Sequence, residues 1–266
     1  MQIVTKEPKT RILSAIELSP VVIHVPHASV AIPAAERGSF LCDLSEELHK
    51  MTDHYCDEIF CTGNRSVVFP VSRLVCDPER FRDDAQESMC AVGMGAVYTR
   101  THDGGSLRNV NSIQRERILK SYYDPHHAAL AAEVKRTLDQ SGRCLIIDGH
   151  SFFPEPLPYE SDQSIRRPDF CIGTDPYHTP DALAKTATDF LGERDYSVAV
   201  NAPFAGALVP LAYYRKNPRV CSIMIEINRR LYMHEDGSRS ESFQEICGVI
   251  RALINTLESA ENQIRL

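Results

Sequence analysis

The run of residues 144–148 constrains the fold more than any other stretch of this chain. Its residues are Cys-Leu-Ile-Ile-Asp, and Gly-His-Ser follow directly at 149–151. A short apolar run rich in β-branched residues is typical of a strand buried on both faces, the kind found in parallel sheets. Ligands of open α/β sheets bind just beyond the carboxyl ends of such strands. The run therefore predicts an α/β fold and places His150 where a functional site is expected.

Two further apolar runs end in polar residues in the same way. Val21–Val25 leads into a Pro-His-Ala-Ser segment that contains His27, and residues 221–225 lead into Glu226. Strands that run parallel end at the same edge of a sheet, so we expect these side chains to meet. Zinc binds imidazole nitrogen and carboxylate oxygen, and a catalytic site keeps one position open for water. We predict that His27, His150 and one carboxylate form such a site, although each histidine alone can also be a hydrogen-bonded loop residue.

The carboxylate that completes this metal site is not fixed by spacing. Asp53 is one candidate, because apolar residues two positions away on either side place it at the edge of the buried face of a predicted helix, although it can also be a solvated acid on that helix. Asp77 and Asp148 are the alternatives. Asp148 can instead orient His150 from behind, as acids often do for metal-binding histidines.

Glu226 follows five largely apolar residues at the end of a predicted buried strand. Burying a carboxylate without a partner is costly, so stability alone is a weak reason for an acid there. One interpretation is an ion pair with Arg229 or Arg230. The other is a general base that takes a proton from water, its pKa raised by desolvation.

Strands and helices alternate along the chain, which predicts a mostly parallel mixed sheet with helices on both faces, in one domain spanning 1–266. Residues 1–19 are expected to form an irregular arm. Two polar segments, 77–108 and 152–168, cannot build a core and are predicted to be active-site loops. The expected strands are 21–25, 66–70, 144–148, 170–173, 197–200 and 220–227, and the expected helices are 44–61, 109–123, 125–140, 180–191 and 241–259.

Composition narrows the class of protein. The net charge of −7 disfavours a nucleic-acid partner, and no apolar run approaches the ~20 residues of a membrane span. The nine cysteines are odd in number and contain no C-x-x-C pair, which favours a reducing compartment. The first residues lack the apolar core of a signal peptide. We therefore expect a cytoplasmic protein without nucleic-acid or membrane partners.

Arginines between residues 73 and 108 favour a small anionic substrate, because a guanidinium binds a carboxylate through two parallel hydrogen bonds. Asn201 and Gly206 flank the end of a predicted strand, where glycine permits close backbone approach, although ordinary turn chemistry also explains them. Ser151 beside His150 raises the alternative of a serine hydrolase. The G-x-S-x-G signature of that class is absent.

Seven segments together resemble one known family, and they occur in the same order between residues 21 and 232. They are Pro26-His27-Ala28-Ser29, Thr52-Asp53, residues 72–80 (SRLVCDPER, close to S-R-x-x-x-D-x-N-R), residues 123–127 (YDPHH, close to Y-x-P-Y-H), residues 147–151 (IDGHS), Asn201-x-Pro203-Phe204-x-Gly206, and Ile225-Glu226-Ile227. The sequence resembles the N-formylglutamate amidohydrolase family, whose members are similar to zinc carboxypeptidases and aspartoacylases in fold and site.

This resemblance implies a zinc-carboxypeptidase-like fold with one zinc ion per chain and cleavage of an amide C–N bond. His27 and His150 would bind the metal, Glu226 would be the base, and Arg73 or Arg80 would bind a substrate carboxylate or polarise the scissile carbonyl. The implied substrate is N-formyl-L-glutamate, with formate and glutamate as products at the last step of one route of histidine breakdown. The motif residues Asp77, His127, Asn201 and Gly206 are then expected at the substrate.

Three positions depart from the expected patterns. The carboxypeptidases have a glutamate three residues after the first histidine, where this chain has Val30, so the resemblance leaves Asp53 as the expected acidic ligand. The asparagine before Arg80 is replaced by Glu79, and a Gly-Gly pair by Gly206-Ala207. Because the latter two touch expected substrate contacts, an amidase for another N-acyl amino acid or a peptide is an alternative. The metal can also be a divalent ion other than zinc. A further alternative for the function is a non-catalytic binding protein on the same fold.

Overall fold

The computed structural model describes residues 11–13, 19–60 and 63–264, which form a seven-stranded mixed sheet in the order β1-β3-β2-β4-β7-β5-β6. The four central strands β3, β2, β4 and β7 run parallel, whereas β1 is antiparallel to β3, and β5 and β6 run against β7. The predicted α/β class with a mostly parallel mixed sheet is therefore confirmed. The strands are β1 (Arg11–Leu13), β2 (Val21–Val25), β3 (Arg65–Val68), β4 (Cys144–Phe152), β5 (Phe170–Gly173), β6 (Val198–Val200) and β7 (Val220–Asn228).

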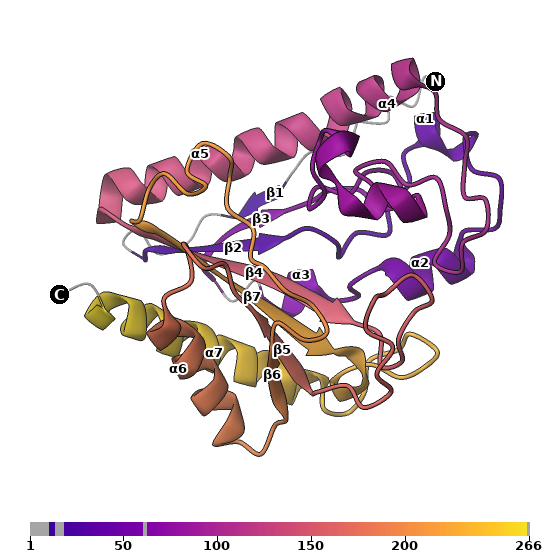
Figure 1. The fold of residues 1–266 in the computed structure, drawn as a ribbon. Helices are drawn as coiled ribbons and strands as arrows, with labels where there is room; N and C mark the ends of the chain where they lie inside the picture. Colours follow the sequence, from indigo (N-terminus) through magenta and orange to yellow (C-terminus); the bar gives the residue numbers. More distant parts are fainter. Residues whose placement is uncertain (1–10, 14–18, 61–62, 265–266) are drawn as a thin grey trace, which may run out of the picture.

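Helices cover both faces of this sheet, as predicted. The long α4–α5 rod lies over one face, and α6 and α7 lie under the other (Figure 1). No helix among the described residues combines the length and apolar character needed to cross a membrane. The helices are α1 (Ala34–Arg37), α2 (Ser45–Met51), α3 (Cys56–Ile59), α4 (Ser112–Ile118), α5 (Asp124–Ser141), α6 (Asp181–Gly192) and α7 (Phe243–Ile264), with single turns η1 (Asp84–Gln86), η2 (Ser88–Val92), η3 (Leu119–Tyr123) and η4 (Arg229–Leu231).

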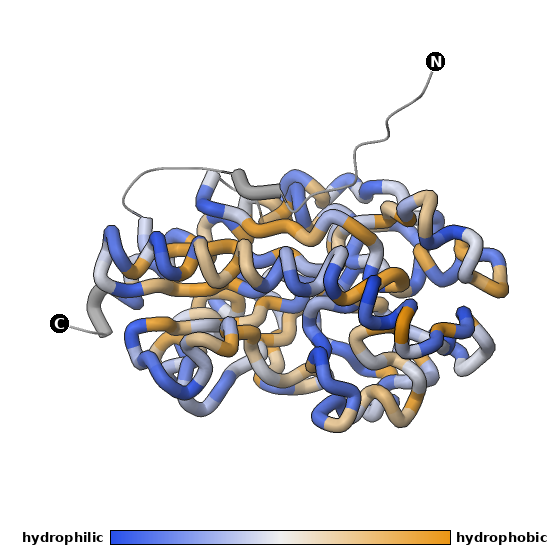
Figure 2. Tube along the Cα trace, turned by 90° about the horizontal axis from the view of Figure 1, so that it is seen from above, coloured by the Kyte–Doolittle hydropathy of each residue, from blue (hydrophilic) through white to orange (hydrophobic). Residues whose placement is uncertain are grey.

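The largest core lies between the sheet and α6 and α7. Side chains of a strand alternate between its faces, so every second residue of β2, β4 and β7 points into this core. A smaller core lies under α5 on the opposite face of the sheet. Stretches of hydrophobic residues run through the interior of the protein, whereas the outer loops are mostly hydrophilic (Figure 2). The residues that β2, β4 and β7 contribute to the larger core are Val21, Ile23, Val25, Leu145, Ile147, Cys221, Ile223, Ile225 and Ile227.

The single helix predicted over 44–61 is wrong. The chain forms α2 and α3, separated by Thr52, which is extended (ψ 136°), and by Tyr55, which is left-handed (φ 65°). Arg229 stabilises the break, since its Nη1 donates to Lys50 O (2.7 Å) at the end of α2. Asp53 lies within this break, and its N–H donates to His27 O (3.0 Å). The break therefore brings Asp53 to the carboxyl end of β2.

Two other expectations need correction. The two helices predicted over 109–123 and 125–140 form one continuous rod, in which the π-helical turn η3 joins α4 to α5. Pro125 does not break the rod, because it lies in the first turn of α5, where no N–H donor is required. The arm expected over 1–19 includes β1, which pairs with the otherwise open edge of β3. Residues 1–10 and 14–18 lie outside the described residues.

Candidate metal and substrate site

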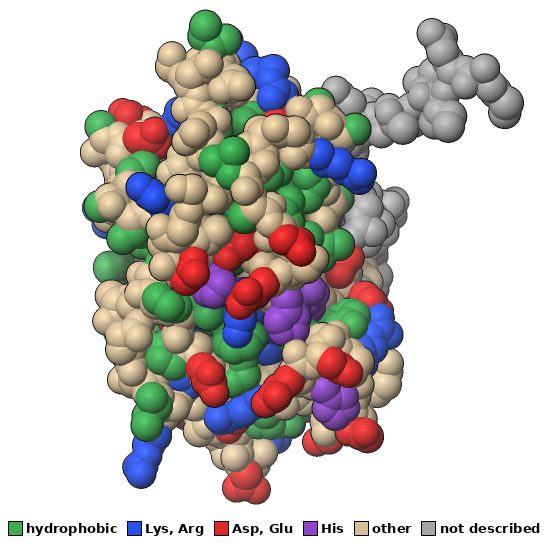
Figure 3. All heavy atoms as spheres, turned by 90° about the vertical axis from the view of Figure 1, so that its right-hand side faces the viewer, with side chains coloured by type: hydrophobic (Ala, Val, Ile, Leu, Met, Phe, Trp, Pro, Cys, Tyr) green, Lys and Arg blue, Asp and Glu red, His purple; other side chains and the backbone are tan. Residues whose placement is uncertain are grey.

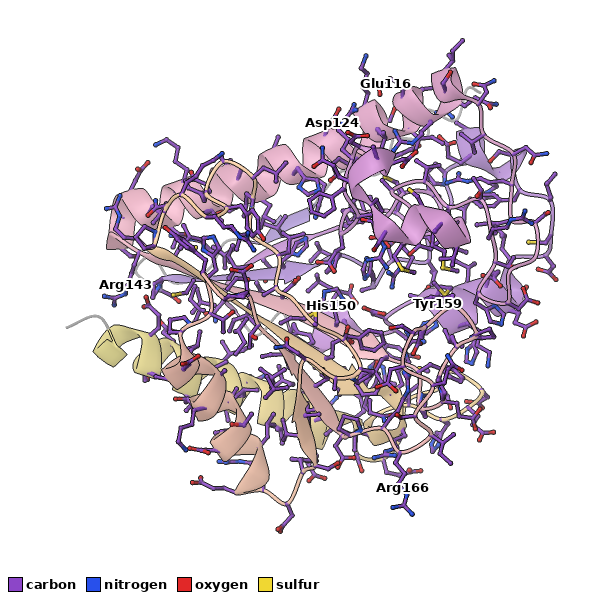
Figure 4. The ribbon with its side chains drawn as sticks, in the orientation of Figure 1. Glu116, Asp124, Arg143, His150, Tyr159 and Arg166 are labelled. Carbon is purple, nitrogen blue, oxygen red and sulfur yellow. The ribbon has the colours of Figure 1, made fainter. Side chains whose placement is uncertain are left out.

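The register of the central strands brings the predicted residues together. His24 of β2 lies beside Asp148 of β4, and His150 of β4 lies beside Glu226 of β7. His27 follows β2 by two residues. Figure 4 shows His150 towards the carboxyl end of β4, with Tyr159 of the following loop further along in the same direction, beyond the sheet. The carboxyl ends of three strands therefore deliver these side chains to one place, as the apolar runs indicated.

Asp53 lies between the two predicted metal-binding histidines. Its Oδ2 is 3.1 Å from His150 Nδ1 and 3.6 Å from His27 Nδ1, and all three side chains are almost fully buried. Arg229 Nη2 donates to the other oxygen, Asp53 Oδ1 (3.1 Å). Arg229 thus fixes the carboxylate with Oδ2 turned towards the histidines. This contact also removes Arg229 as a partner of Glu226, one of the interpretations of that residue.

The second ring nitrogen of His27 contacts Asp77, with 2.9 Å between Nε2 and Oδ1. Asp77 also accepts from Arg73 Nη2 (2.8 Å) and from the Tyr98 hydroxyl (2.5 Å). The paired carboxylate accepts the Nε2 proton, which leaves a lone pair on Nδ1. That Nδ1 atom is buried and has no hydrogen-bond partner among the described residues. The arrangement is that of a metal-binding histidine held from behind by an acid.

Acids also face the second ring nitrogen of His150, although this atom, Nε2, is buried without a hydrogen-bond partner among the described residues. Its Nε2 lies 3.1 Å from Glu79 Oε2 and 3.3 Å from Asp148 Oδ1. Asp148 also contacts His24 Nδ1 (2.7 Å), and His24 Nε2 lies 2.9 Å from His126 Nε2. Asp148 therefore lies behind His150 at ion-pair distance, and His24 and His126 extend the network into the interior. The sequence reasoning missed both histidines. The signal for His24 was a polar residue inside an otherwise apolar strand.

The donor set fits a divalent cation. Burial opposes a charge on His150, but Glu79, Asp148 and Asp53 raise the pKa of its ring well above the usual value. Burial also acts against ionisation of Asp53, yet the two histidines hold its pKa well below the usual range. Two imidazoles and a carboxylate are the ligands zinc prefers in catalytic sites. His27, His150 and Glu79 offer three donor atoms that all lie within 4.8 Å of one another, so Glu79 is a rival of Asp53 for the acidic position.

Glu226 is suited to accept a proton. It is 7% exposed, its Oε2 has no hydrogen-bond partner among the described residues, and burial raises the pKa of its carboxyl to about 8. The two arginines considered as partners bind elsewhere: Arg229 to Asp53, and Arg230 Nη2 to Asp169 Oδ1 (2.8 Å). An ion pair with Arg229 or Arg230 therefore does not explain Glu226.

A cavity of about 410 Å³, which we call the main cavity, joins the two histidines, Asp53 and Glu226 to Arg73, Arg80 and the loop over 152–168. Acidic, basic and histidine side chains gather in the middle of the face onto which it opens (Figure 3). Arg73 is fixed, since its Nε donates to the Tyr98 hydroxyl (3.1 Å) and its Nη2 to Asp77. Arg80 Nε has no hydrogen-bond partner among the described residues and lies 3.9 Å from Asp77 Oδ2. Arg80 is the freer cation.

The remaining predicted residues lie in different places. His127 and Gly206 line a neighbouring cavity of about 340 Å³, and Asp77 lines neither cavity because it lies behind His27. Asn201 also lines neither, and its Oδ1 accepts from the N–H of Thr174 (2.9 Å). Ser151 Oγ accepts from Arg229 Nε (3.2 Å), and the His150 ring faces carboxylates on both sides, so no base is placed for a serine nucleophile.

Comparison with known proteins adds evidence about the fold and its family. A family model described as N-formylglutamate amidohydrolase matches residues 19–233. N-formylglutamate deformylase of Pseudomonas aeruginosa is 26% identical over 258 residues, which cover 90% of this chain and 92% of that protein. The crystal structure of N-formylglutamate amidohydrolase from Ralstonia eutropha JMP134 has a TM-score of 0.84 at 24% identity, covering 97% and 99% of the two chains. A gene product of Agrobacterium tumefaciens has a TM-score of 0.70 at 17% identity, covering 97% of each chain.

Proposed function

Because the chain belongs to the N-formylglutamate amidohydrolase family, we propose that it is a metal-dependent amidohydrolase that hydrolyses the amide of an N-formyl amino acid. N-formyl-L-glutamate, which would give formate and glutamate, is the reference substrate because the names of the relatives carry it. One observation supports the proposal most: Asp53 Oδ2 lies between the Nδ1 atoms of His27 and His150, in a cavity that also contains the unpaired Glu226.

His27, Asp53 and His150 would hold one zinc ion or another divalent cation. A cation held there supplies Lewis acidity, which polarises an amide carbonyl and lowers the pKa of water. The protein side chains provide the rest of the site. Asp77 holds the His27 ring through a hydrogen bond to Nε2, and the charge of Asp148, 3.3 Å from His150 Nε2, favours the ring orientation that turns Nδ1 of His150 towards Asp53.

Glu226 takes a proton from the attacking water and delivers it to the departing amine nitrogen. Its raised pKa matches a group that must both accept and release a proton near neutral pH. Arg73, fixed by Asp77 and Tyr98, lines the cavity as a rigid positive charge for the oxygen of the tetrahedral intermediate. Arg80, the freer cation, binds the α-carboxylate of the substrate. The reaction balances as amide plus water giving formate and a free amino acid.

The test combines metal analysis with formate release. We expect about one divalent ion per chain, formate release from N-formyl-L-glutamate or another N-formyl amino acid, loss of release after chelation, and its return on adding zinc. Asp53→Asn and Glu79→Gln separate the two acidic candidates, because loss of the true ligand should lower the metal content more than loss of the other acid. His234→Ala, at an exposed histidine that lines neither cavity, is the control. A protein that takes up no metal after zinc is added would be a binding protein instead.

A further inference from the structure

Four basic side chains line the main cavity: Lys50, Arg73, Arg80 and Arg229. Arg73 and Arg229 each form an ion pair with a buried aspartate, at 2.8 and 3.1 Å. Arg80 has only a distant acid, since its Nε lies 3.9 Å from Asp77 Oδ2. The ammonium of Lys50 has no acidic partner in the described part of the chain. Two cations of the main cavity, Lys50 and Arg80, are therefore free to bind an anionic ligand.

We propose that Lys50 binds the side-chain carboxylate of the substrate and selects an acidic side chain. The proposal rests on the proposed function, which places the formamide near Glu226 and the α-carboxylate on Arg80. N-formyl-L-glutamate carries a second carboxylate at the end of its side chain, and Lys50 is the second free cation. Lys50 lies outside the seven family-like segments, two residues before Thr52, so no sequence motif singled it out.

The main chain fixes Lys50 relative to the predicted metal ligands. Lys50 lies in the last turn of α2, and its carbonyl oxygen accepts from Arg229 Nη1 (2.7 Å). The same guanidinium donates through Nη2 to Asp53 Oδ1 (3.1 Å). One arginine therefore links the backbone of Lys50 to the carboxylate expected to bind the metal. Substrate groups bound at these two positions are then held at a fixed separation, which favours a reactive geometry.

An aromatic ring holds the ammonium of Lys50 at the cavity. Nζ lies 4.0 Å from the centroid of the Phe153 ring, which belongs to the loop over 152–168 and also lines the main cavity. A cation over an aromatic face is attracted by the ring, and its N–H donors remain available to an anion. Phe153 packs with Met51 and Leu157, which line the same cavity. The methylene groups of a glutamate side chain can pack on this apolar wall while its carboxylate reaches Lys50.

Two acids of the same loop line the main cavity and could compete with the substrate for Lys50, but both have other partners. Glu160 forms an ion pair with Arg167, and Asp162 Oδ1 accepts from the N–H of Ser164 (2.8 Å). A substrate carboxylate would therefore be the first anion to pair with Lys50. A terminal amide, as in glutamine, has almost the same shape but offers only an uncharged acceptor, which forms a weaker hydrogen bond.

The experiment compares kcat/KM of the metal-loaded enzyme for N-formyl-L-glutamate and N-formyl-L-glutamine. We expect glutamate to exceed glutamine by about tenfold or more in the wild type, the scale of one hydrogen bond between charged groups. Lys50→Met keeps the length of the side chain and its packing on Phe153 but removes the charge. It should lower the glutamate value by about tenfold, lower the glutamine value far less, and bring the ratio close to one.

Two further variants separate the charge of Lys50 from its packing. Lys50→Arg keeps the charge and should retain most of the preference for glutamate. Lys185→Met, at an exposed lysine of α6 that lines neither cavity, is the matched control and should leave both values unchanged. A wild-type ratio in Lys50→Met, or an equal loss for both substrates, would overturn the assignment, because packing or stability would then account for Lys50.

Binding measured without turnover separates this assignment from the proposed reaction. Calorimetry on metal-loaded Glu226→Gln should give a lower Kd for N-formyl-L-glutamate than for N-formyl-L-glutamine, and adding Lys50→Met should remove the difference. If this holds but the wild type releases formate from neither compound, the Lys50 assignment stands and the proposed reaction fails. If formate is released but Lys50→Met leaves the ratio unchanged, the reaction stands and the assignment of Lys50 fails.

Discussion

The same three strands, β2, β4 and β7, present two different faces. On the face towards α6 and α7, the strands are apolar along most of their length, and residues such as Ile23, Ile147 and Ile225 are fully buried. On the face towards α5, the strands begin apolar and then change, so that their carboxyl halves carry His24, Asp148, His150 and Glu226. Neighbouring residues in the chain therefore serve different purposes, one for stability and the next for chemistry.

The alternation of side chains between the two faces of each strand fixes the positions of the polar side chains. A shift of the pairing by one residue would turn every polar side chain into the large core and every apolar one into the site. The continuous apolar face opposes such a shift, because exposing it would cost burial at every second residue. The apolar face thus fixes the register that puts His150 beside Glu226. Substitutions of two adjacent residues, one on each face of the same strand, test whether one face serves stability and the other serves chemistry.

The largest expected effect belongs to Glu226→Gln, on the polar face. The amide keeps the size of the side chain but cannot accept the proton, so we expect kcat to fall by about 10²–10⁴-fold. Metal content should stay at the wild-type value, and the free energy of unfolding should not fall, because an unpaired buried carboxyl is removed. Formate release, metal analysis and urea denaturation measure the three quantities. Full activity in this variant would remove Glu226 from the reaction.

The adjacent residue on the apolar face should behave in the opposite way. Ile225→Ala leaves a cavity in the large core and should lower the free energy of unfolding by about 2–5 kcal/mol. The kcat of the folded fraction should change little, since the Ile225 side chain points away from the site. Urea denaturation and active-site-normalised kinetics check both expectations. A loss of kcat as large as that of Glu226→Gln, without loss of stability, would contradict the division between the faces.

Asp148→Asn should have a smaller effect, because it acts on the metal through His150. The amide keeps the shape but weakens the hold on Nε2 of His150, and we expect metal affinity to fall by about 10–100-fold. Competition with a chelator of known affinity measures the change. Ile147→Val, the neighbour on the apolar face, is the matched control and should leave metal affinity unchanged. Equal loss of affinity in both variants would point to a general loosening of β4.

The strands and the polar residues at their ends were predictable because each depends on a local run of sequence. The segments around His27, His150 and Glu226 are apolar runs that end in a polar residue, and such runs report burial without knowledge of the rest of the chain. The positions of these strands in a mostly parallel sheet followed from the helices between them. The order of the strands did not follow, because it depends on pairing between distant segments.

Asp53 was selected for a partly incorrect reason. The sequence placed it on a continuous helix, whereas it lies in a break between two short helices. That break depends on Arg229, which is 176 residues further along the chain, and no local pattern contains such information. Because of the same separation in sequence, the hydrogen bond from Arg229 to Asp53 was not predicted, and Arg229 was considered only as an ion-pair partner of Glu226. Asn201 shows the converse, since a residue within a matching motif has its amide bound to Thr174 in a turn.

His24 gives the smallest expected effect and the sharpest test of how far the polar face extends. It does not touch the predicted metal ligands but contacts Asp148 Oδ1 through Nδ1 (2.7 Å). His24→Leu removes this contact and should weaken metal affinity by less than about tenfold, below the effect expected of direct changes behind a ligand. His24→Asn keeps an N–H donor near the position of Nδ1 and should restore most of the affinity. If Leu and Asn weaken it equally, the contribution of His24 is packing rather than orientation of Asp148, and the functional part of the polar face begins at Asp148.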